Sequence, residues 1–341
     1  MTALREADEL CRRVLGIHQA ICEEVVAACE ASSTDDLARV VGDDAGDTLF
    51  AIDRVTEASL LAHFSDLSRK WPCLLVAEGL GKDGTALLPT GTEIDDVEIV
   101  AIVDPIDGTR GLMYQKRPAW ILTGVAPFRG RRPTLQDVEL AVQTEIPLVK
   151  QHLYDRLWAV AGKGVQAERT DRLSGERRRL SPQPSRASTI AQGFGGLSRF
   201  FPGARATLAA IDDDIVDGLL GPGVEGRAQA FEDQYISTGG QLYELVMGHD
   251  RWIADLRPLL ARVLQARGRP PGICCHPYDL STELIAREAG VIVTDPRGEP
   301  LGAPLDVFSD VAWVGYANPA IRDQVHPALQ HALQSHGLLA G

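Results

Sequence analysis

The chain has 341 residues, of which 45% are hydrophobic and 24% are charged, a composition typical of a globular protein that builds a core without disulfide bonds. This length exceeds that of a usual single core, so we expect one large or two medium domains. The net charge of −13 argues against a general nucleic-acid binder, and an acidic chain that holds an anionic substrate needs local positive charge, for which metal ions are one source.

The cysteines and the N-terminus bear on the cellular compartment. The six cysteines include no CxxC pair and no zinc-ligand spacing, so we interpret them as reduced cysteines, with a metal site at Cys274-Cys275-His276 as the less favoured alternative. The first residues lack a signal-peptide core, and no apolar run approaches the roughly 18 residues that span a bilayer. We therefore expect a soluble cytoplasmic protein with no membrane or nucleic-acid partner.

The first half of the chain alternates helical and strand patterns. Residues 5–31 place their apolar side chains on one helical face, and a second helix is expected from Asp53, its N-cap, to about residue 64. The Arg-rich stretch 172–180 is interpreted as a hairpin with a solvated charged face, with a nucleic-acid patch as the less favoured alternative. Apolar or β-branched runs predict strands, the last three of them neighbours in one sheet, at residues 72–78, 97–103, 120–128, 138–146 and 156–162.

A Pro- and Ser-rich stretch at 181–188 is the predicted domain boundary, which divides the chain into residues 1–185 and 186–341. The mixture of strands and helices in both parts predicts an α/β or α+β layered fold. Beyond the boundary, the pattern predicts strands at 189–194, 291–295 and 311–317, and helices within 197–209, 239–247, 253–272 and 279–290 and from Ile321 onward.

The string Asp-Pro-Ile-Asp-Gly-Thr, which starts at Asp104, follows the strand at 97–103 directly. Asp104 and Asp107 stand three residues apart across a proline-fixed turn, so both carboxylates and the carbonyl of Ile106 can face the space beyond the strand end. Hard oxygen ligands of this kind suit Mg²⁺. Gly108 permits a tight turn, after which backbone amides can meet a phosphate oxygen. The alternative is an ordinary Asp-Gly surface turn.

These residues resemble the inositol monophosphatase family of metal-dependent, lithium-sensitive phosphatases. The string matches the family's first signature without a mismatch. Residues 46–57 are similar to its upstream segment with two aspartates, here Asp47 and Asp53, and residues 146–166 to the strand pair that ends in a Gly-Lys-Gly turn. Residues 278–301 resemble the second signature with its helix and strand. The resemblance covers nearly the whole chain and implies the family's sugar-phosphatase fold of alternating α-β-α-β-α layers.

The resemblance also implies the metal ligands. Glu78, Asp104 and the carbonyl of Ile106 would hold one Mg²⁺, and Asp104, Asp107 and Asp279 would hold a second, with a third ion as a further option. Two ions about 3.5–4 Å apart can clamp the attacking and leaving oxygens of an in-line displacement. Asp279 has the alternative role of a helix N-cap, and Glu78 that of a solvated loop acid.

The remaining site residues follow from the same resemblance. Asp53 and Thr109 match the positions that orient and help deprotonate the attacking water, although Asp53 can also be only a helix cap. Gly108, Thr109 and Arg110 are the candidate substrate-binding residues. A cation at Arg110 could meet a second phosphate, or it could only cover the entrance of the helix that follows.

The chain departs from the family pattern at three places. Gly79 stands where the family usually has a second glutamate, which helps to hold a weaker third ion. Tyr278 replaces the usual tryptophan, and residues 280–282 replace a run of small residues. Extra sequence precedes Asp279, so the acid that contacts substrate in inositol enzymes has two candidates, Asp250 and Asp255.

The function expected from these observations is hydrolysis of a small phosphomonoester by an inositol monophosphatase-like, Mg²⁺-dependent enzyme, in which two metal ions activate water. Family resemblance also predicts a homodimer. The alternatives are a 3′(2′),5′-bisphosphate nucleotidase, for which Arg110-Gly111 speaks, and a fructose-1,6-bisphosphatase. Outside the enzymes, a catalytically weak metal-binding homologue remains an alternative because the second glutamate is absent.

Overall fold

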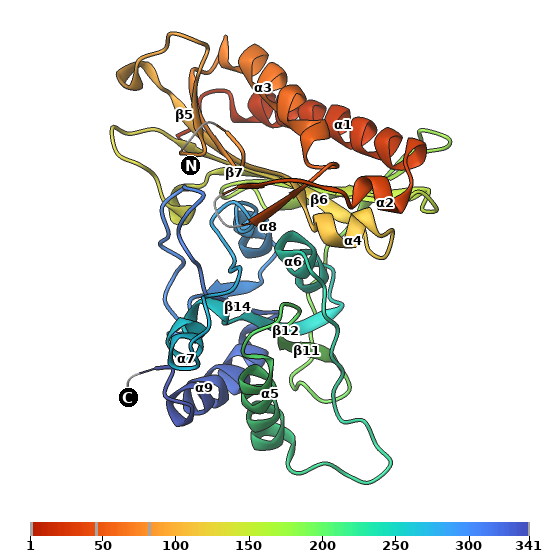
Figure 1. Ribbon diagram of the computed structural model, residues 1–341, viewed down its shortest axis with the longest axis vertical. Helices are drawn as coiled ribbons and strands as arrows, with labels where there is room; N and C mark the ends of the chain where they lie inside the picture. Colours follow the sequence, from red (N-terminus) through yellow and green to blue (C-terminus); the bar gives the residue numbers. More distant parts are fainter. Residues whose placement is uncertain (1–2, 45–46, 81–82, 340–341) are drawn as a thin grey trace.

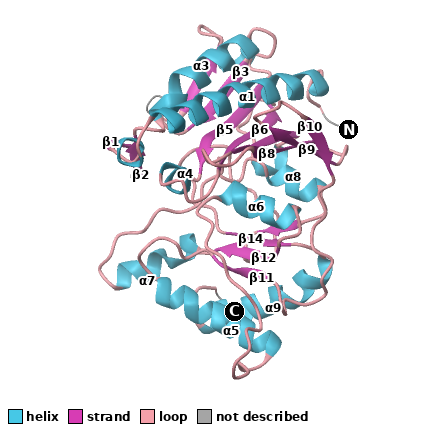
Figure 2. Ribbon diagram, turned by 90° about the vertical axis from the view of Figure 1, so that its right-hand side faces the viewer, coloured by secondary structure: helices cyan, strands magenta, loops and turns pink. Residues whose placement is uncertain are grey.

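The computed structural model describes residues 3–44, 47–80 and 83–339, and it is built in five layers (Figure 1). A helical layer, a large sheet, a second helical layer, a smaller sheet and a third helical layer follow one another along the long axis (Figure 2). This order confirms the predicted α-β-α-β-α arrangement. The helices of the three layers are α1 (Ala7–Ala31) with α3 (Arg54–Ser68), α6 (Thr238–Val246) with α8 (Glu283–Glu288), and α5 (Arg205–Leu220) with α9 (Pro319–Ser335).

The large sheet has eight strands in the order β10-β9-β8-β7-β6-β5-β3-β4. β3 and β5 are parallel, and the other neighbours are antiparallel. The carboxyl ends of β3 and β5 therefore meet at one edge, where Glu78 follows β3 and Asp107 ends β5. The strands are β3 (Cys73–Ala77), β4 (Thr85–Leu88), β5 (Ile99–Asp107), β6 (Ala119–Pro127), β7 (Leu140–Ile146), β8 (Leu153–Val160), β9 (Val165–Asp171) and β10 (Arg177–Leu180).

The small sheet has four strands in the order β11-β12-β14-β13, with β11 and β12 parallel. Its strands are β11 (Phe194–Leu197), β12 (Asp250–Asp255), β13 (Ile292–Thr294) and β14 (Trp313–Tyr316). The shorter elements are the β1–β2 pair (Val40–Asp44, Asp47–Phe50), the helices α2 (Thr34–Leu37), α4 (Thr109–Met113) and α7 (Ala261–Ala266), and the 3₁₀ turns η1 (Ile94–Asp96), η2 (Leu135–Asp137) and η3 (Arg257–Leu260).

The central strands of the large sheet are buried on both faces. All seven residues of β7 are buried, because α1 packs on one face of the sheet while α6 and α8 pack on the other. Four of its seven residues are apolar, and apolar and polar positions do not alternate along the strand. Its polar residues Gln143, Thr144 and Glu145 must find partners inside the protein.

Several predicted elements are confirmed, and others are wrong in their bounds. The helices at 5–31 and from Asp53 are α1 and α3, and the last three predicted strands of the first half are neighbours. The strand predicted at 189–194 begins only at Phe194. The helix predicted within 197–209 begins at Arg205, because Pro202-Gly203 interrupts the segment before it. The region 253–272 opens with the end of β12 and keeps only α7 as α-helix.

The predicted boundary at 181–188 falls between β10 and β11, the strands that end the large sheet and begin the small one in chain order. The division into residues 1–185 and 186–341 stays a prediction. Among the described residues, no helix has both the length and the apolar character that a membrane crossing requires.

Candidate functional site

The turn after β5 brings the two aspartates of the Asp-Pro-Ile-Asp-Gly-Thr string to the sheet edge. The pairing of β5 with β6 shifts between Asp104 and Asp107, so the strand bulges at the proline. Gly108 has a φ of 97° and joins the strand to α4. A side chain there would also lie 3.1 Å from the Cβ of Ser237. Glycine is therefore required both by the turn and by the close approach of α6.

Three carboxylates from two distant parts of the chain meet at this edge. One oxygen each of Asp104, Asp107 and Asp279 lies within 4.8 Å of the others. Asp107 is buried, and the other two are half-buried. These residues are the three that the sequence predicted to share one metal ion.

The electrostatics of the cluster favour the binding of a cation. Burial raises the pKa of Asp104 well above its ordinary value, and the neighbouring charges of Asp107, Asp279 and Glu78 raise it further. Burial and the charge of Asp107 raise the pKa of Asp279 in the same way. Burial raises the pKa of Asp107 to about 6. A bound cation would remove this mutual repulsion, and the all-oxygen donor set fits a hard divalent ion.

Asp107 is fixed by the first residues of α6. Its Oδ2 accepts hydrogen bonds from Ser237 Oγ at 2.7 Å and from Gly239 N at 2.6 Å, and its Oδ1 accepts one from Thr238 N at 3.3 Å. Ser237 Oγ in turn accepts a bond from Gly240 N and so caps the helix. The positive end of α6 thus faces a carboxylate, which it stabilises in the charged form.

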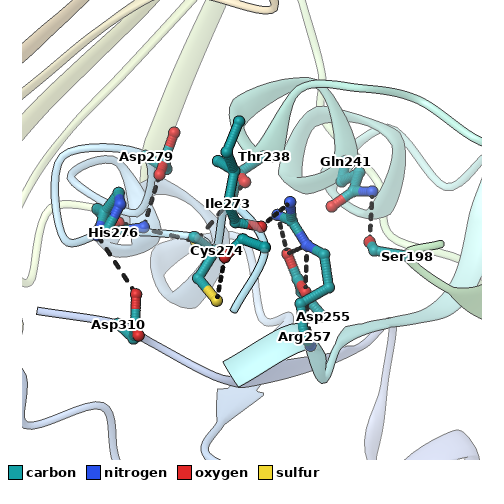
Figure 3. Close-up of polar contacts among 12 residues, drawn as sticks. Ser198, Thr238, Gln241, Asp255, Arg257, Ile273, Cys274, His276, Asp279 and Asp310 are labelled. Carbon is teal, nitrogen blue, oxygen red and sulfur yellow. Dashed lines mark hydrogen bonds and ion pairs between the residues drawn. The ribbon is translucent and has the colours of Figure 1, made fainter. Parts of the chain in front are cut away.

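Asp279 is held by the turn that precedes α8. Its Oδ2 accepts a hydrogen bond from His276 N at 2.6 Å (Figure 3). The charge of Arg257 also lowers the pKa of Asp279, against the larger effect of burial. The helix begins at Glu283, with Thr282 in the N-cap position. The predicted helix start at Asp279 and the alternative of Asp279 as its cap are therefore both wrong.

Asp53 and Thr109 lie side by side at the start of α3 and α4. Thr109 Oγ lies 3.0 Å from Asp53 Oδ1 and 2.8 Å from the carbonyl oxygen of Ile106, so its hydroxyl can donate to either. Asp53 stands in the N-cap position of α3, but its Oδ2 accepts from Phe50 N at 2.8 Å. This arrangement places a carboxylate-backed hydroxyl one residue after the turn that carries the cluster.

The carboxyl end of β3 supplies Glu78 and Gly79. Glu78 is half-buried, and its charge contributes to the raised pKa of both Asp104 and Asp279, so it belongs to the same group of carboxylates. Gly79 has a φ of 79°. This is a left-handed backbone that disfavours a glutamate. The side chain of Asp47 lies outside the described residues.

Arg110 takes part in a stack of alternating arginine and phenylalanine side chains. Its guanidinium lies 5.6 Å from the ring centre of Phe50 and 5.0 Å from that of Phe201. Arg257 lies 5.3 Å from Phe201 and 4.6 Å from Phe200. The contacts of Arg110 are those expected if it covers the entrance of α4.

The two candidates for the substrate-contacting acid lie at opposite ends of β12. Asp255 is fully buried and pairs with Arg257, whose Nη1 also donates to the carbonyl of Ile273 (Figure 3). Asp250 begins the strand, and Asp255 ends it on the side of Arg257. Asp255 is therefore occupied by Arg257, which also holds the inserted segment through Ile273.

Sequence reasoning missed the residues that hold the carboxylates. Ser237, Thr238 and Gly239 form the binding turn for Asp107, and the run Ser-Thr-Gly-Gly was the signal, since a capping serine before paired glycines is typical of a helix start that receives an anion. The alternative metal site at Cys274-Cys275-His276 finds no support: both cysteines are buried, and burial raises the pKa of each thiol.

Solved structures of the same fold share most of their length with this chain. Fructose-1,6-bisphosphatase of Leishmania major is 13% identical with a TM-score of 0.69, covering 96% of this chain and 95% of its own. Extragenic suppressor protein SuhB of Bartonella henselae is 14% identical with a TM-score of 0.64, covering 94% and 97%. Inositol monophosphatase of Anabaena is 14% identical with a TM-score of 0.58, covering 96% and 97%.

These likenesses show that the chain has the inositol monophosphatase fold, as the sequence motifs predicted. No protein-family model and no curated protein matches the sequence.

Proposed function

We propose that this protein is a Mg²⁺-dependent hydrolase of a small phosphate monoester, an inositol monophosphatase-like enzyme. The observation that carries the proposal is the meeting of Asp104, Asp107 and Asp279 oxygens within 4.8 Å, next to the Asp53–Thr109 pair. Solved structures similar to this protein include an inositol monophosphatase, a fructose-1,6-bisphosphatase and SuhB. We propose two ions, the first held by Glu78, Asp104 and the Ile106 carbonyl.

When bound, the ions would neutralise the phosphoryl oxygens and make water more acidic. The protein's own groups would do the rest. The attacking water passes a proton to Thr109 Oγ, which passes its own proton to Asp53 Oδ1, 3.0 Å away. The water oxygen forms a bond to phosphorus, the bond to the ester oxygen breaks, and that oxygen takes a proton from solvent. Gly108, Thr109 and Arg110 are the proposed contacts to the phosphate ester.

The geometry of Arg110 favours a monophosphate over a bisphosphate as the substrate. Its guanidinium packs near Phe50 and Phe201, as a cover of the helix entrance would. A homodimer remains part of the proposal on family resemblance, and a cytoplasmic location on the pattern of the cysteines.

The test is phosphate release from a panel of inositol monophosphate, fructose 1,6-bisphosphate and a 3′,5′-bisphosphate nucleotide, with Mg²⁺ and with a chelator. We expect Mg²⁺-dependent release, fastest from the monophosphate. Asp104→Asn is isosteric and removes the charge that both proposed ions share. Because charge stabilisation by the ions is worth several kcal/mol, the rate of this variant should fall below about a tenth of wild type.

Without metal, the same variant should be more stable than the wild type, although it is less active. Asp104→Asn removes one of the repelling carboxylates, so the metal-free variant should melt at a higher temperature than the metal-free wild type. A wild-type protein that is inactive on every ester would overturn the proposed function, and so would an Asp104→Asn variant with nearly full activity.

A further inference from the structure

Gln143 lies in the middle of β7, and its side-chain amide joins two separate elements. The residue is 2% exposed. Its Nε2 donates to the carbonyl oxygen of Gly239 at 2.7 Å, and its Oε1 accepts from Thr282 Oγ at 3.0 Å. One side chain therefore connects the first turn of α6 with the residue that precedes α8.

Both partners of Gln143 stand next to a carboxylate of the cluster. The residue whose carbonyl it binds, Gly239, uses its own N–H to hold Asp107 Oδ2 at 2.6 Å. Thr282 lies three residues after Asp279, at the end of the turn in which His276 N holds the Asp279 carboxylate. The amide of Gln143 thus completes a path from Asp107 to Asp279 through the protein.

The sheet gives this path a rigid base. Leu122 pairs with Asp104 on one side and with Gln143 on the other, so the three residues form one row across the sheet and share a face. A side chain on Gly239 would come within 2.5 Å of Leu122. α6 therefore rests directly on the row, with no space in which it could shift toward the sheet.

The turn before α8 approaches the sheet equally closely. A side chain on Gly124, a neighbour in β6, would come within 2.5 Å of the carbonyl oxygen of Ser281. Ser281 precedes Thr282, the second partner of Gln143. The turn before α8 is thus seated on the backbone of β6 and α6 on the side chain of Leu122, and the amide of Gln143 hydrogen-bonds to both elements.

We propose that Gln143 is a positioning residue that sets the separation of Asp107 and Asp279 and thereby the affinity of the site for divalent cations. The inference rests on the proposed function for the role of the cluster. Without the amide, the Gly239 carbonyl and the Thr282 hydroxyl lose their buried partner, and each element must move to find another. Outer partners of metal ligands typically change affinity by 10–100-fold when they are removed.

The experiment measures Mg²⁺ and Mn²⁺ binding to the purified full chain by calorimetry, so it does not depend on activity. Gln143→Met preserves the length of the side chain and removes both hydrogen bonds, and Kd should rise about tenfold. Thr282→Val should raise Kd in the same direction. The double variant should be little worse than Gln143→Met alone, because both changes break one path.

Thr144→Val is the matched control. Thr144 is the next residue of β7, is also fully buried, and bonds His18 Nδ1 at 3.0 Å on the α1 face. This change costs a buried hydrogen bond on the same strand but lies on the opposite face from the carboxylates. It should lower the melting temperature and leave Kd within about twofold of wild type. If the role of Gln143 were purely structural, Gln143→Met would give this same result.

Thr282→Val covers the case in which Gln143→Met does not fold, because it removes only the bond from Thr282 and keeps the donor to Gly239; we expect an intermediate Kd. A wild-type Kd in either variant, or an equal rise in Thr144→Val, overturns the inference. A wild type that binds Mg²⁺ but hydrolyses no ester defeats the proposed function and leaves the Gln143 result standing. A wild type without divalent-cation binding overturns both.

Discussion

The hydroxyl of Thr109 lies 3.0 Å from Asp53 Oδ1, and this contact joins the first residue of α4 to the N-cap position of α3. The two helices belong to segments more than fifty residues apart. Phe50 N holds the other carboxylate oxygen of Asp53, so its orientation is fixed from behind. The hydroxyl of Thr109 therefore has this carboxylate as one of its two possible acceptors, the other being the Ile106 carbonyl, and the carboxylate is the acceptor that a proton relay from water requires.

Thr109→Val should lower kcat and leave cation binding unchanged. Valine has nearly the shape of threonine but cannot accept the proton of water, and the loss of general-base assistance costs on the order of 10²-fold or more. Steady-state kinetics and Mg²⁺ calorimetry on the same sample measure the two effects. Thr109→Ser keeps the hydroxyl and should recover much of the rate. A Thr109→Val variant with wild-type kcat would remove Thr109 from the proposed relay.

The absent second glutamate should make the wild type require high Mg²⁺, and Gly79 offers a controlled test. Its φ of 79° makes a glutamate strained, but aspartate and asparagine tolerate this backbone better than other residues. Gly79→Asp and Gly79→Asn share the same strain and differ only in charge. Gly79→Asp should reach half-maximal rate at about tenfold lower Mg²⁺ than Gly79→Asn, because ligand charge tunes affinity. Equal requirements in the two variants would show that a carboxylate at this position does not serve the ions.

The sequence predicted the carboxylate cluster because its members lie in local strings with a physical reason for their order. Asp104 and Asp107 follow a β-branched strand, and a proline and a glycine fix the turn between strand and helix. Asp279 was found by resemblance alone, since nothing local separates it from a helix cap. The helix in fact begins at Glu283, so the boundary was wrong although the residue meets the others.

The residues that hold the carboxylates could not be predicted because their roles depend on packing across the layers. Gln143 is a polar residue in an apolar strand, and its partners Gly239 and Thr282 lie about 100 and 140 residues further along the chain. Arg257 pairs with Asp255 inside an insertion that the motif pattern does not cover. Such contacts follow from the way α6 and α8 are seated on the sheet, which no short string of residues encodes.

Arg110→Ala should affect monophosphates and bisphosphates alike. The guanidinium lies between the rings of Phe50 and Phe201, so its removal disturbs the entrance of α4 for every substrate. The measurement is the ratio of kcat/KM for a 3′,5′-bisphosphate nucleotide to that for inositol monophosphate, before and after the change. We expect this ratio to stay within about threefold. If Arg110 instead pairs with a second phosphate, the ratio should fall about thirtyfold, and the nucleotidase would become the better assignment.

Glu145 should make the protein less stable as the pH rises from about 4.5 to about 7. Glu145 and Asp155 are cross-strand neighbours on β7 and β8, and burial raises the pKa of Glu145 to about 7. Gln151 Nε2 and Asp155 N donate to its two oxygens at 2.7 and 2.9 Å, but Arg169 gives its guanidinium to Asp155. The ionised form of Glu145 therefore lacks the compensation that Asp155 has.

The sign follows from the raised pKa. The folded protein keeps a proton on Glu145 in a range in which the unfolded chain has lost it, so folding is opposed increasingly between pH 4.5 and 7. Raising the pKa of Glu145 from about 4.5 to about 7 corresponds to about 3 kcal/mol of folding free energy. This penalty is present above pH 7 and absent below pH 4.5. Glu145→Gln carries no ionisable group, so its unfolding free energy, measured by urea denaturation, should fall less steeply over this range. The unfolding free energy of Glu145→Gln relative to that of the wild type should therefore rise by up to about 3 kcal/mol from pH 4.5 to 8. Two parallel curves over this range would mean that Glu145 ionises in the folded protein as readily as in the unfolded chain.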